Sequence, residues 1–345
     1  MSCPNLAQPN LSTSLLHEPV PASKPILEGL GPLQHFIGTW TNKPLFGLDN
    51  REVDGSSASP FSYCLMPLPE ESSESVYGYI LKNFYYFEEI SFSPISGVVA
   101  NRGGSYTQVA NTLFYEQRVF FADSRAGEPS PRTVNGLVHA ENGSWLRLTT
   151  QEQTLGPYGG ADCNAKIPNN KVPHQDKTRN ITKQMSVPHG NSVLAQGTFS
   201  EMPNGGIPAI KILNGLPEGI NTKPYTMNGK IGNPSSIYTQ NPNQILVDAL
   251  DAQRELGHEP LAYIHLSVDS MNADIGVLNI PFGTTKAKIA RYRADYWLEA
   301  FSFDGGSPVY NQLQYSQFMN LIIPINGKMV NFPHITVNTL TRNSA

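Results

Sequence analysis

The sequence has few cysteines, little charge and no long apolar run, and each of these absences excludes a class of protein. Its three cysteines, Cys3, Cys64 and Cys163, form no C-x-x-C pair and suit neither a disulfide framework nor a zinc site. Charged residues make up only 15% of the chain, which argues against a long solvent-exposed helical protein. The cysteine usage indicates a reducing compartment.

The charge balance and the amino terminus exclude further classes of partner. The formal net charge is −4, so we expect no basic surface for nucleic acid or anionic lipid. No apolar stretch approaches the roughly 20 residues that a membrane-spanning helix needs. The amino terminus lacks the charged and apolar regions of a signal peptide. The sequence therefore predicts a cytoplasmic protein that binds neither nucleic acid nor membranes.

The common catalytic motifs are absent as well. The chain contains no G-x-S-x-G nucleophile elbow, no phosphate-binding loop and no G-x-G-x-x-G stretch. Glu88 and Glu89 are neighbours in an expected strand, so their side chains point to opposite faces and cannot act together on one substrate. The 8 histidines remain as candidates for a functional site.

What the sequence does contain is a succession of strand patterns separated by turn residues. Glycine (29) and proline (28) are abundant, which indicates many turns and loops. Alternating apolar segments follow one another up to about residue 150 and again from about residue 260. The stretches "ENGS" (141–144) and "FDGGS" (303–307) predict hairpin turns, because their residues suit tight turns.

This pattern predicts a mostly β protein with a short leading helix. We expect a closed, antiparallel up-and-down barrel, since closure removes the exposed edges of aromatic-rich strands. Residues 1–27 are expected to form an extended segment and residues 28–345 a single barrel domain. Within that domain, residues 151–260 read as a loop-rich insertion that carries one helix, with Asn241 as its cap and Gly257 at its end. The apolar residues on one face of this helix, expected to be buried, are Ile245, Ala249, Ala252 and Leu256.

Three stretches resemble a known family. "FIGTW" (36–40) after a short helix is shared by the calycin-like barrels, which include fatty-acid-binding proteins and lipocalin relatives. "FEEISFSP" (87–94) and "VHAENGSWLRL" (138–148) resemble strands of the nitrobindins, small ten-stranded barrels that bind ferric heme. The ending, which includes "FPHITVNTL" (332–340), is similar to their last strands. The resemblance covers roughly residues 28–150 and 275–342 and implies a calycin-like barrel with bound heme b.

The same resemblance implies that His334 is the proximal ligand of the heme iron. A neutral imidazole binds iron through one ring nitrogen while the other donates a hydrogen bond that fixes the tautomer. On the strand pattern alone, His334 shares a face with Thr336 and Asn338, and that polar face could equally point to solvent. Thr39 and Trp40 belong to the matched GTW motif, and Trp40 reads first as a core residue and second as a neighbour of the heme.

Two further histidines are candidates for the pocket. His139 belongs to the matched HAE motif, which implies a pocket residue, but Glu141 or the backbone could equally hold it as a structural group. His265 lies on the strand face opposite Ile264 and Leu266. It is either a surface histidine or a distal hydrogen-bond donor over the iron.

The main functional hypothesis is a ferric heme protein that acts on nitric oxide, peroxynitrite or peroxide by binding, isomerisation or peroxidase-like turnover. The chain departs from the nitrobindins after Trp40, where "TNKPLFGLD" replaces a glycine-rich stretch, and in the insertion, which has no counterpart. Two alternatives stay open. One is a heme-free carrier of a fatty acid or other apolar metabolite in the same barrel, and the other is a non-heme enzyme whose site lies in the insertion.

Overall fold

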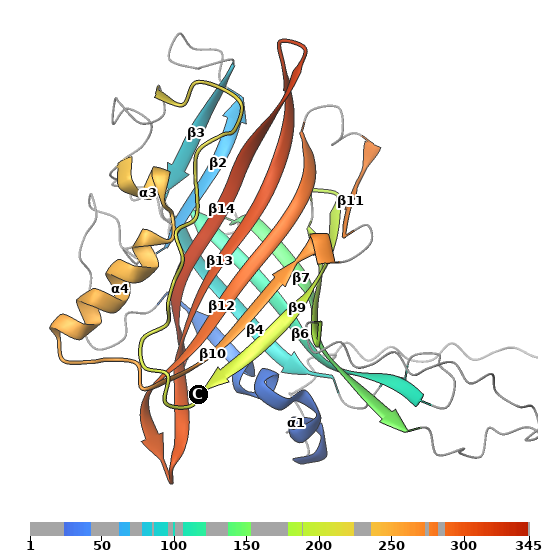
Figure 1. Cartoon of the computed structure of the whole chain (residues 1–345), viewed down its shortest axis with the longest axis vertical. Helices are drawn as coiled ribbons and strands as arrows, with labels where there is room; N and C mark the ends of the chain where they lie inside the picture. The colour runs from blue at the N-terminus through green and yellow to red at the C-terminus, as the bar shows by residue number, and fades with distance from the viewer. Residues whose placement is uncertain are drawn as a thin grey trace, which may run out of the picture.

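The protein is built on one antiparallel sheet that closes on itself (Figure 1). The computed structural model describes residues 24–42, 62–69, 78–84, 86–95, 99–100, 106–121, 137–152, 179–187, 189–223, 236–272, 276–281 and 287–343. In spatial order the barrel strands are β1 (Gly38–Thr41), β4 (Tyr86–Pro94), β6 (Tyr106–Phe121), β7 (Leu137–Glu152), β8 (Ile181–Val187), β9 (Asn191–Met202), β10 (Ala262–Asp269), β12 (Lys288–Asp304), β13 (Ser307–Ile325) and β14 (Lys328–Arg342). β14 pairs with β1 and completes the ring. The predicted mostly β, closed antiparallel barrel is therefore confirmed.

A short helical segment lies at one end of the barrel, as predicted. Helix α1 (Lys24–Leu30) passes into the 3-10 helix η1 (Gly31–Phe36) at Gly31, whose φ of 54° suits a glycine. Leu33 and Phe36 are fully buried and pack against Trp40 of β1 in the main core. The Trp40 indole donates a hydrogen bond of 2.7 Å to the Phe36 carbonyl, so the helix is anchored to the barrel.

An outer layer covers the barrel wall formed by β12, β13 and β14 (Figure 1). It consists of helices α3 (Ser236–Gln240) and α4 (Gln244–Glu255). The hairpin β2 (Tyr63–Pro69) and β3 (Tyr79–Phe84) instead extends the sheet itself, since β2 pairs with β14. The remaining short elements are β5 (Val99–Ala100), β11 (Val277–Asn279) and η3 (Ser270–Asn272). None of the helices in the described part of the chain has the length and apolar character that crossing a bilayer requires.

The range read from the sequence as an insertion, residues 151–260, contributes two barrel strands. β8 and β9 lie inside this range, and they join β7 to β10 in the ring. The strand patterns of these two short segments are flanked by proline- and glycine-rich stretches, which hid them in the sequence. Only the connection from β9 to β10, which carries α3 and α4, lies outside the barrel wall among the described residues of this range.

The predicted helix of this connection is present as α4. It buries Ile245 and Ala249, as expected, and Gly257 follows its end with a φ of 84°. Asn241, the predicted cap, instead accepts a hydrogen bond from the backbone N–H of Leu213. Leu256, expected on the buried face, is half exposed.

Of the two predicted hairpin turns, one is confirmed and one is wrong. Gly305 and Gly306 join β12 to β13 with positive φ angles of 55° and 82°. The Asn142–Gly143 pair instead lies in the middle of β7. A Cβ on Gly143 would stand 2.0 Å from the Gln184 carbonyl oxygen of the neighbouring strand, so the glycine permits a close approach of strands and makes no turn.

Candidate functional site

A cavity of about 510 Å³ lies inside the barrel at the end away from η1. Trp40, which packs on η1, pairs with Arg342 of β14, so Arg342 marks the end of β14 near η1. His334 lies eight residues before Arg342, which places it roughly 26 Å further along the strand. We call this space the mouth cavity. It is lined by Cys64, Met66, Tyr86, Gln117, Val119, His139, Glu141, Val187, His189, Asn191, Ala287, Ile289, Tyr315, Gln317, Met319, Leu321, His334 and Thr336.

The His334 side chain faces this cavity from β14. The polar face of the strand, which could have pointed to solvent, points into the barrel: Thr336 also lines the cavity and Asn338 is completely buried. The apolar residues Ile335 and Val337 point outward, where α4 covers them together with their neighbours on β2 in the sheet. The outer layer therefore decides the orientation of His334, because it offers an apolar contact to the outer face of β14.

The environment of His334 favours a neutral imidazole. Burial, together with the positive charges that His139 and His189 can carry, lowers its pKa to about 4. No described residue forms a hydrogen bond with the ring. At neutral pH one ring nitrogen therefore has a lone pair available to a ligand in the cavity.

Two more histidines lie in the wall of the mouth cavity. His139 comes from β7 and His189 from the connection between β8 and β9, and their ring centroids are 5.6 Å apart. His139 Nε2 lies 3.7 Å from a carboxylate oxygen of Glu141, so both predicted alternatives for this residue are compatible with its position. The sequence carried no spacing signal for His189. Burial and the neighbouring His139 lower its pKa.

A lysine is completely buried beneath the cavity. The Lys183 ammonium donates hydrogen bonds to Glu141 at 3.1 Å, to the Tyr292 hydroxyl at 2.7 Å and to the Tyr296 hydroxyl at 3.1 Å. Four aromatic rings surround it, with centroids 5.0–5.9 Å from Nζ: Tyr115, Trp145, Tyr292 and Tyr296. Although burial works against ionisation, Lys183 lowers the pKa of Glu141 to about 2. Glu141 is therefore ionised. Burial lowers the pKa of Lys183, and the charge of Glu141 and its hydrogen bond oppose this shift.

A second buried carboxyl group, Glu88 on β4, lies among hydrogen-bond donors near the cavity. It accepts hydrogen bonds from the Gln117 amide at 2.8 Å, the Asn338 amide at 2.8 Å and the Tyr315 hydroxyl. Because burial outweighs these bonds, the pKa of Glu88 rises to about 7. The Tyr86 and Tyr315 hydroxyls, 2.7 Å apart, link Glu88 to residues that line the cavity.

The other sequence-predicted site residues lie elsewhere. Trp40 belongs to the core at the closed end, and the Thr39 hydroxyl shares a hydrogen bond of 2.9 Å with Ser91. Neither lines the mouth cavity. His265 lies on the outer face of β10, where it stacks on Trp297 and contacts Asp295 at 3.0 Å. The structure thus brings His334 and His139 together and keeps Thr39, Trp40 and His265 apart from them.

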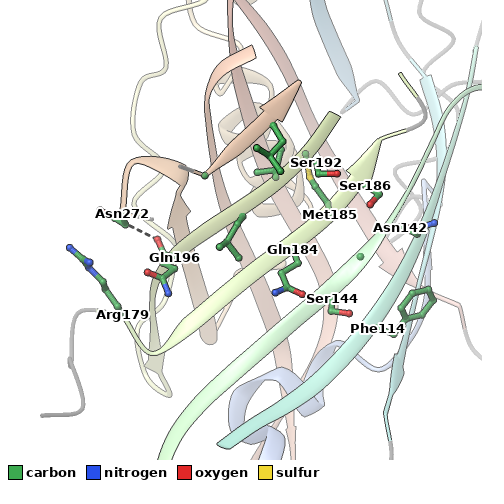
Figure 2. Close-up of a pocket in the computed structure, with 15 residues that line it drawn as sticks. Phe114, Asn142, Ser144, Arg179, Gln184, Met185, Ser186, Ser192, Gln196 and Asn272 are labelled. Atoms are coloured by element: carbon green, nitrogen blue, oxygen red, sulfur yellow. Dashed lines mark hydrogen bonds between the residues drawn. The ribbon is translucent and has the colours of Figure 1, made fainter. Parts of the chain in front are cut away.

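A second, larger hollow of about 900 Å³ lies on the outer surface of β7, β8 and β9 (Figure 2). Its wall is rich in amides and hydroxyls such as Ser144, Gln184 and Ser186. The Asn272 amide there donates a hydrogen bond of 3.0 Å to the Gln196 carbonyl (Figure 2). It contains no histidine and none of the buried charges, so the mouth cavity is the better candidate for chemistry.

Among the described residues, no group of three or more histidine, cysteine, aspartate or glutamate side chains is arranged to hold a bare metal ion. The Cys64 thiol lines the cavity, but burial raises its pKa well above the usual range, so it stays protonated and is a poor metal ligand. Comparison of the chain with protein-family models, with curated proteins and with solved structures finds no significant match.

Proposed function

We propose that the mouth cavity binds ferric heme b and that His334 is the axial ligand of the iron. The observation that carries this proposal is a neutral imidazole, free of hydrogen-bond partners among the described residues, in the wall of a cavity of about 510 Å³. This volume is within the usual range of roughly 300–1,000 Å³ for sites that bind small molecules and cofactors.

The lining of the cavity suits a flat apolar macrocycle. Most of the surface that lines the cavity is apolar; the aliphatic and methionine side chains in it are Met66, Val119, Val187, Ala287, Ile289, Met319 and Leu321. Heme iron is held by its porphyrin and needs only one protein ligand, whereas a bare ion needs three or four. One available histidine without a surrounding ligand cluster therefore fits heme better than it fits a bare metal ion.

Bound ferric heme would supply an iron with a free coordination position, which suits nitric oxide, peroxynitrite or peroxide. The chain itself would hold the macrocycle through His334 and exclude water from the apolar walls. His139 and His189, from β7 and the connection after β8, can offer hydrogen bonds to a small polar molecule in the cavity. These residues support a reaction with small oxidants.

The proposal is tested by adding hemin to the purified protein and recording its absorption spectrum. We expect an intense near-ultraviolet band of bound heme, and we expect His334→Ala to weaken hemin affinity by at least about tenfold because the axial bond is lost. In His334→Gly, free imidazole should restore the wild-type spectrum. Because the pKa of His334 is about 4, the wild-type spectrum should persist on acidification to about pH 5.

The matched control is His265→Ala, which removes a histidine from the outer face of the same barrel. This variant should take up hemin like the wild type. A wild-type protein that takes up no hemin, or a His334→Ala variant with the unchanged spectrum and affinity, would contradict the proposal.

A heme-free carrier of a fatty acid or another apolar metabolite is the second candidate. It is favoured by the combination of apolar walls with the polar groups of Gln117 and Gln317 beneath, since such a cavity suits an apolar chain with a polar head. Two results together would favour the carrier. The wild type and His334→Ala would bind a fluorescent fatty acid with equal affinity, and the wild type would take up no hemin.

A further inference from the structure

We propose that Glu88 is the proton store of the mouth cavity and exchanges protons with it through Tyr315 and Tyr86. This inference rests on the proposed function in one respect, because a proton store matters only where the cavity holds a reacting molecule. The path itself is a property of the chain and can be tested without heme.

The hydrogen bonds form a continuous line from the buried carboxyl group to the cavity. The Tyr315 hydroxyl donates to Glu88 Oε2 and lies 2.7 Å from the Tyr86 hydroxyl. The Tyr86 hydroxyl also donates to the Val337 carbonyl at 3.1 Å. Both tyrosines line the cavity, whereas Glu88 lies behind them and is not in contact with it. Tyr315 is the hydroxyl group that connects Glu88 to the cavity, and Tyr86 extends the line by a second hydroxyl group.

The hydrogen bonds of this line can be formed in two arrangements, with opposite directions of donation. When Glu88 is ionised, Tyr315 donates to the carboxylate and Tyr86 donates to Tyr315. When Glu88 carries a proton, the carboxyl group donates to Tyr315, Tyr315 donates to Tyr86, and Tyr86 donates to the Val337 carbonyl. Each hydroxyl accepts one proton as it releases another, so a proton crosses the line without leaving a charged tyrosine.

The surrounding charges make Glu88, and not Glu141, the group that changes its protonation. Glu141 on β7 is held ionised by Lys183 on β8, and the two charges nearly cancel. Glu88 faces the neutral amides of Gln117 and Asn338 together with Tyr315, and the charge of Glu141 raises its pKa. Its pKa of about 7 lets it give up or take a proton near neutral pH.

The experiment is infrared spectroscopy of the protein without added hemin, as a function of pH. We expect the carbonyl band of protonated Glu88 to disappear as the pH rises through about 7 and to be missing in Glu88→Gln, whereas the band of the second buried carboxyl group, Glu299, remains in the variant and disappears at higher pH. Circular dichroism of the variant establishes that it folds. If no such band changes between pH 6 and pH 8, the proposal fails, whatever the result with hemin.

A pH jump tests the path. Tyr315→Phe leaves Glu88 buried but removes the hydroxyl that connects it to the cavity. After the pH jump, the carboxyl band of this variant should change about tenfold more slowly than in the wild type, or with a smaller amplitude. Tyr292→Phe is the matched control, since this buried tyrosine bonds to Lys183 and does not contact Glu88. We expect wild-type kinetics in the control. A Tyr315→Phe protein that responds as fast as the wild type would overturn the inference.

Discussion

At the scale of single residues, the buried lysine is the group that depends most on its partners, because burial of an unpaired charge is costly. Lys183 is completely buried, and its charge is stabilised by Glu141, by two tyrosine hydroxyls and by the faces of four rings. A buried ion pair contributes little net stability relative to a well-packed apolar pair, but the loss of one partner is costly because it leaves an unpaired charge. The pair therefore constrains which substitutions the core accepts.

Replacement of Lys183 by methionine should destabilise the protein by about 3–5 kcal/mol, because Glu141 is then buried without its cation. Urea denaturation followed by circular dichroism measures the loss. The double variant Lys183→Met with Glu141→Gln should recover a large part of it. If the double variant is less stable than the single one, the argument from an unpaired charge is wrong.

At the scale of elements, α4 is joined to the barrel wall through a buried polar contact. The Gln253 side chain of α4 donates to Gln312 of β13, and Gln312 donates to Glu299 Oε2 of β12 at 2.6 Å. The other carboxylate oxygen of Glu299 is buried and has no hydrogen-bond partner among the described residues. Burial accordingly raises the pKa of Glu299 to about 8.

This raised pKa gives the stability a defined pH dependence. Between about pH 4.5 and pH 8 the folded protein holds a proton on Glu299 that the unfolded chain has released, so the contribution of this residue to stability falls as the pH rises. Glu299→Gln removes this dependence. Relative to the wild type, the variant should gain on the order of a few kcal/mol between pH 5 and pH 9 in urea denaturation.

The control for this prediction is Glu255→Gln, which neutralises an exposed carboxylate on α4, the helix that carries Gln253. Its stability relative to the wild type should change little over the same pH range. An equal gain in both variants would mean that the net charge of the protein, and not the buried carboxyl group, sets the pH dependence.

At the scale of the whole molecule, the barrel has one end filled by side chains and one end with a cavity. The filled end depends on Trp40, which is completely buried and bonds to the Phe36 carbonyl of η1. The cavity end carries the three histidines, roughly 26 Å away along β14. The fold therefore separates Trp40 and its contacts at the filled end from the residues that line the mouth cavity.

This separation predicts independent effects of substitutions at the two ends. Trp40→Ala should cost about 3–5 kcal/mol of stability through loss of packing. Trp40→Phe should cost about 1–3 kcal/mol because the Phe36 carbonyl loses its partner. Urea denaturation gives both values. Hemin affinity measured on folded Trp40→Phe should equal that of the wild type, and a large loss would place Trp40 among the ligand-binding residues.

Particular residues illustrate how far sequence reasoning reached. Strand alternation, the FDGGS turn and the α4 pattern are local signals, and they predicted the barrel class, one hairpin and the helix. Gly143 was misread as a turn residue because the close approach of β8, which requires it, involves a residue 41 positions later in the chain. His189 carried no local signal at all, because only the pairing of β7 with β8 brings it beside His139, 50 positions earlier in the chain.

The sequence alone therefore determined a mostly β chain that closes into a barrel, since side-chain alternation and turn residues act between near neighbours. The tertiary structure decided which face of each strand is inside. On β14 the hydrophobic cover of α4 outweighs the preference of polar residues for water and turns His334 inward. It also decided the charge states of Glu88, Glu141 and Lys183, because burial and pairing across strands set them. The likeness to heme-binding barrels remains a prediction that hemin uptake will test.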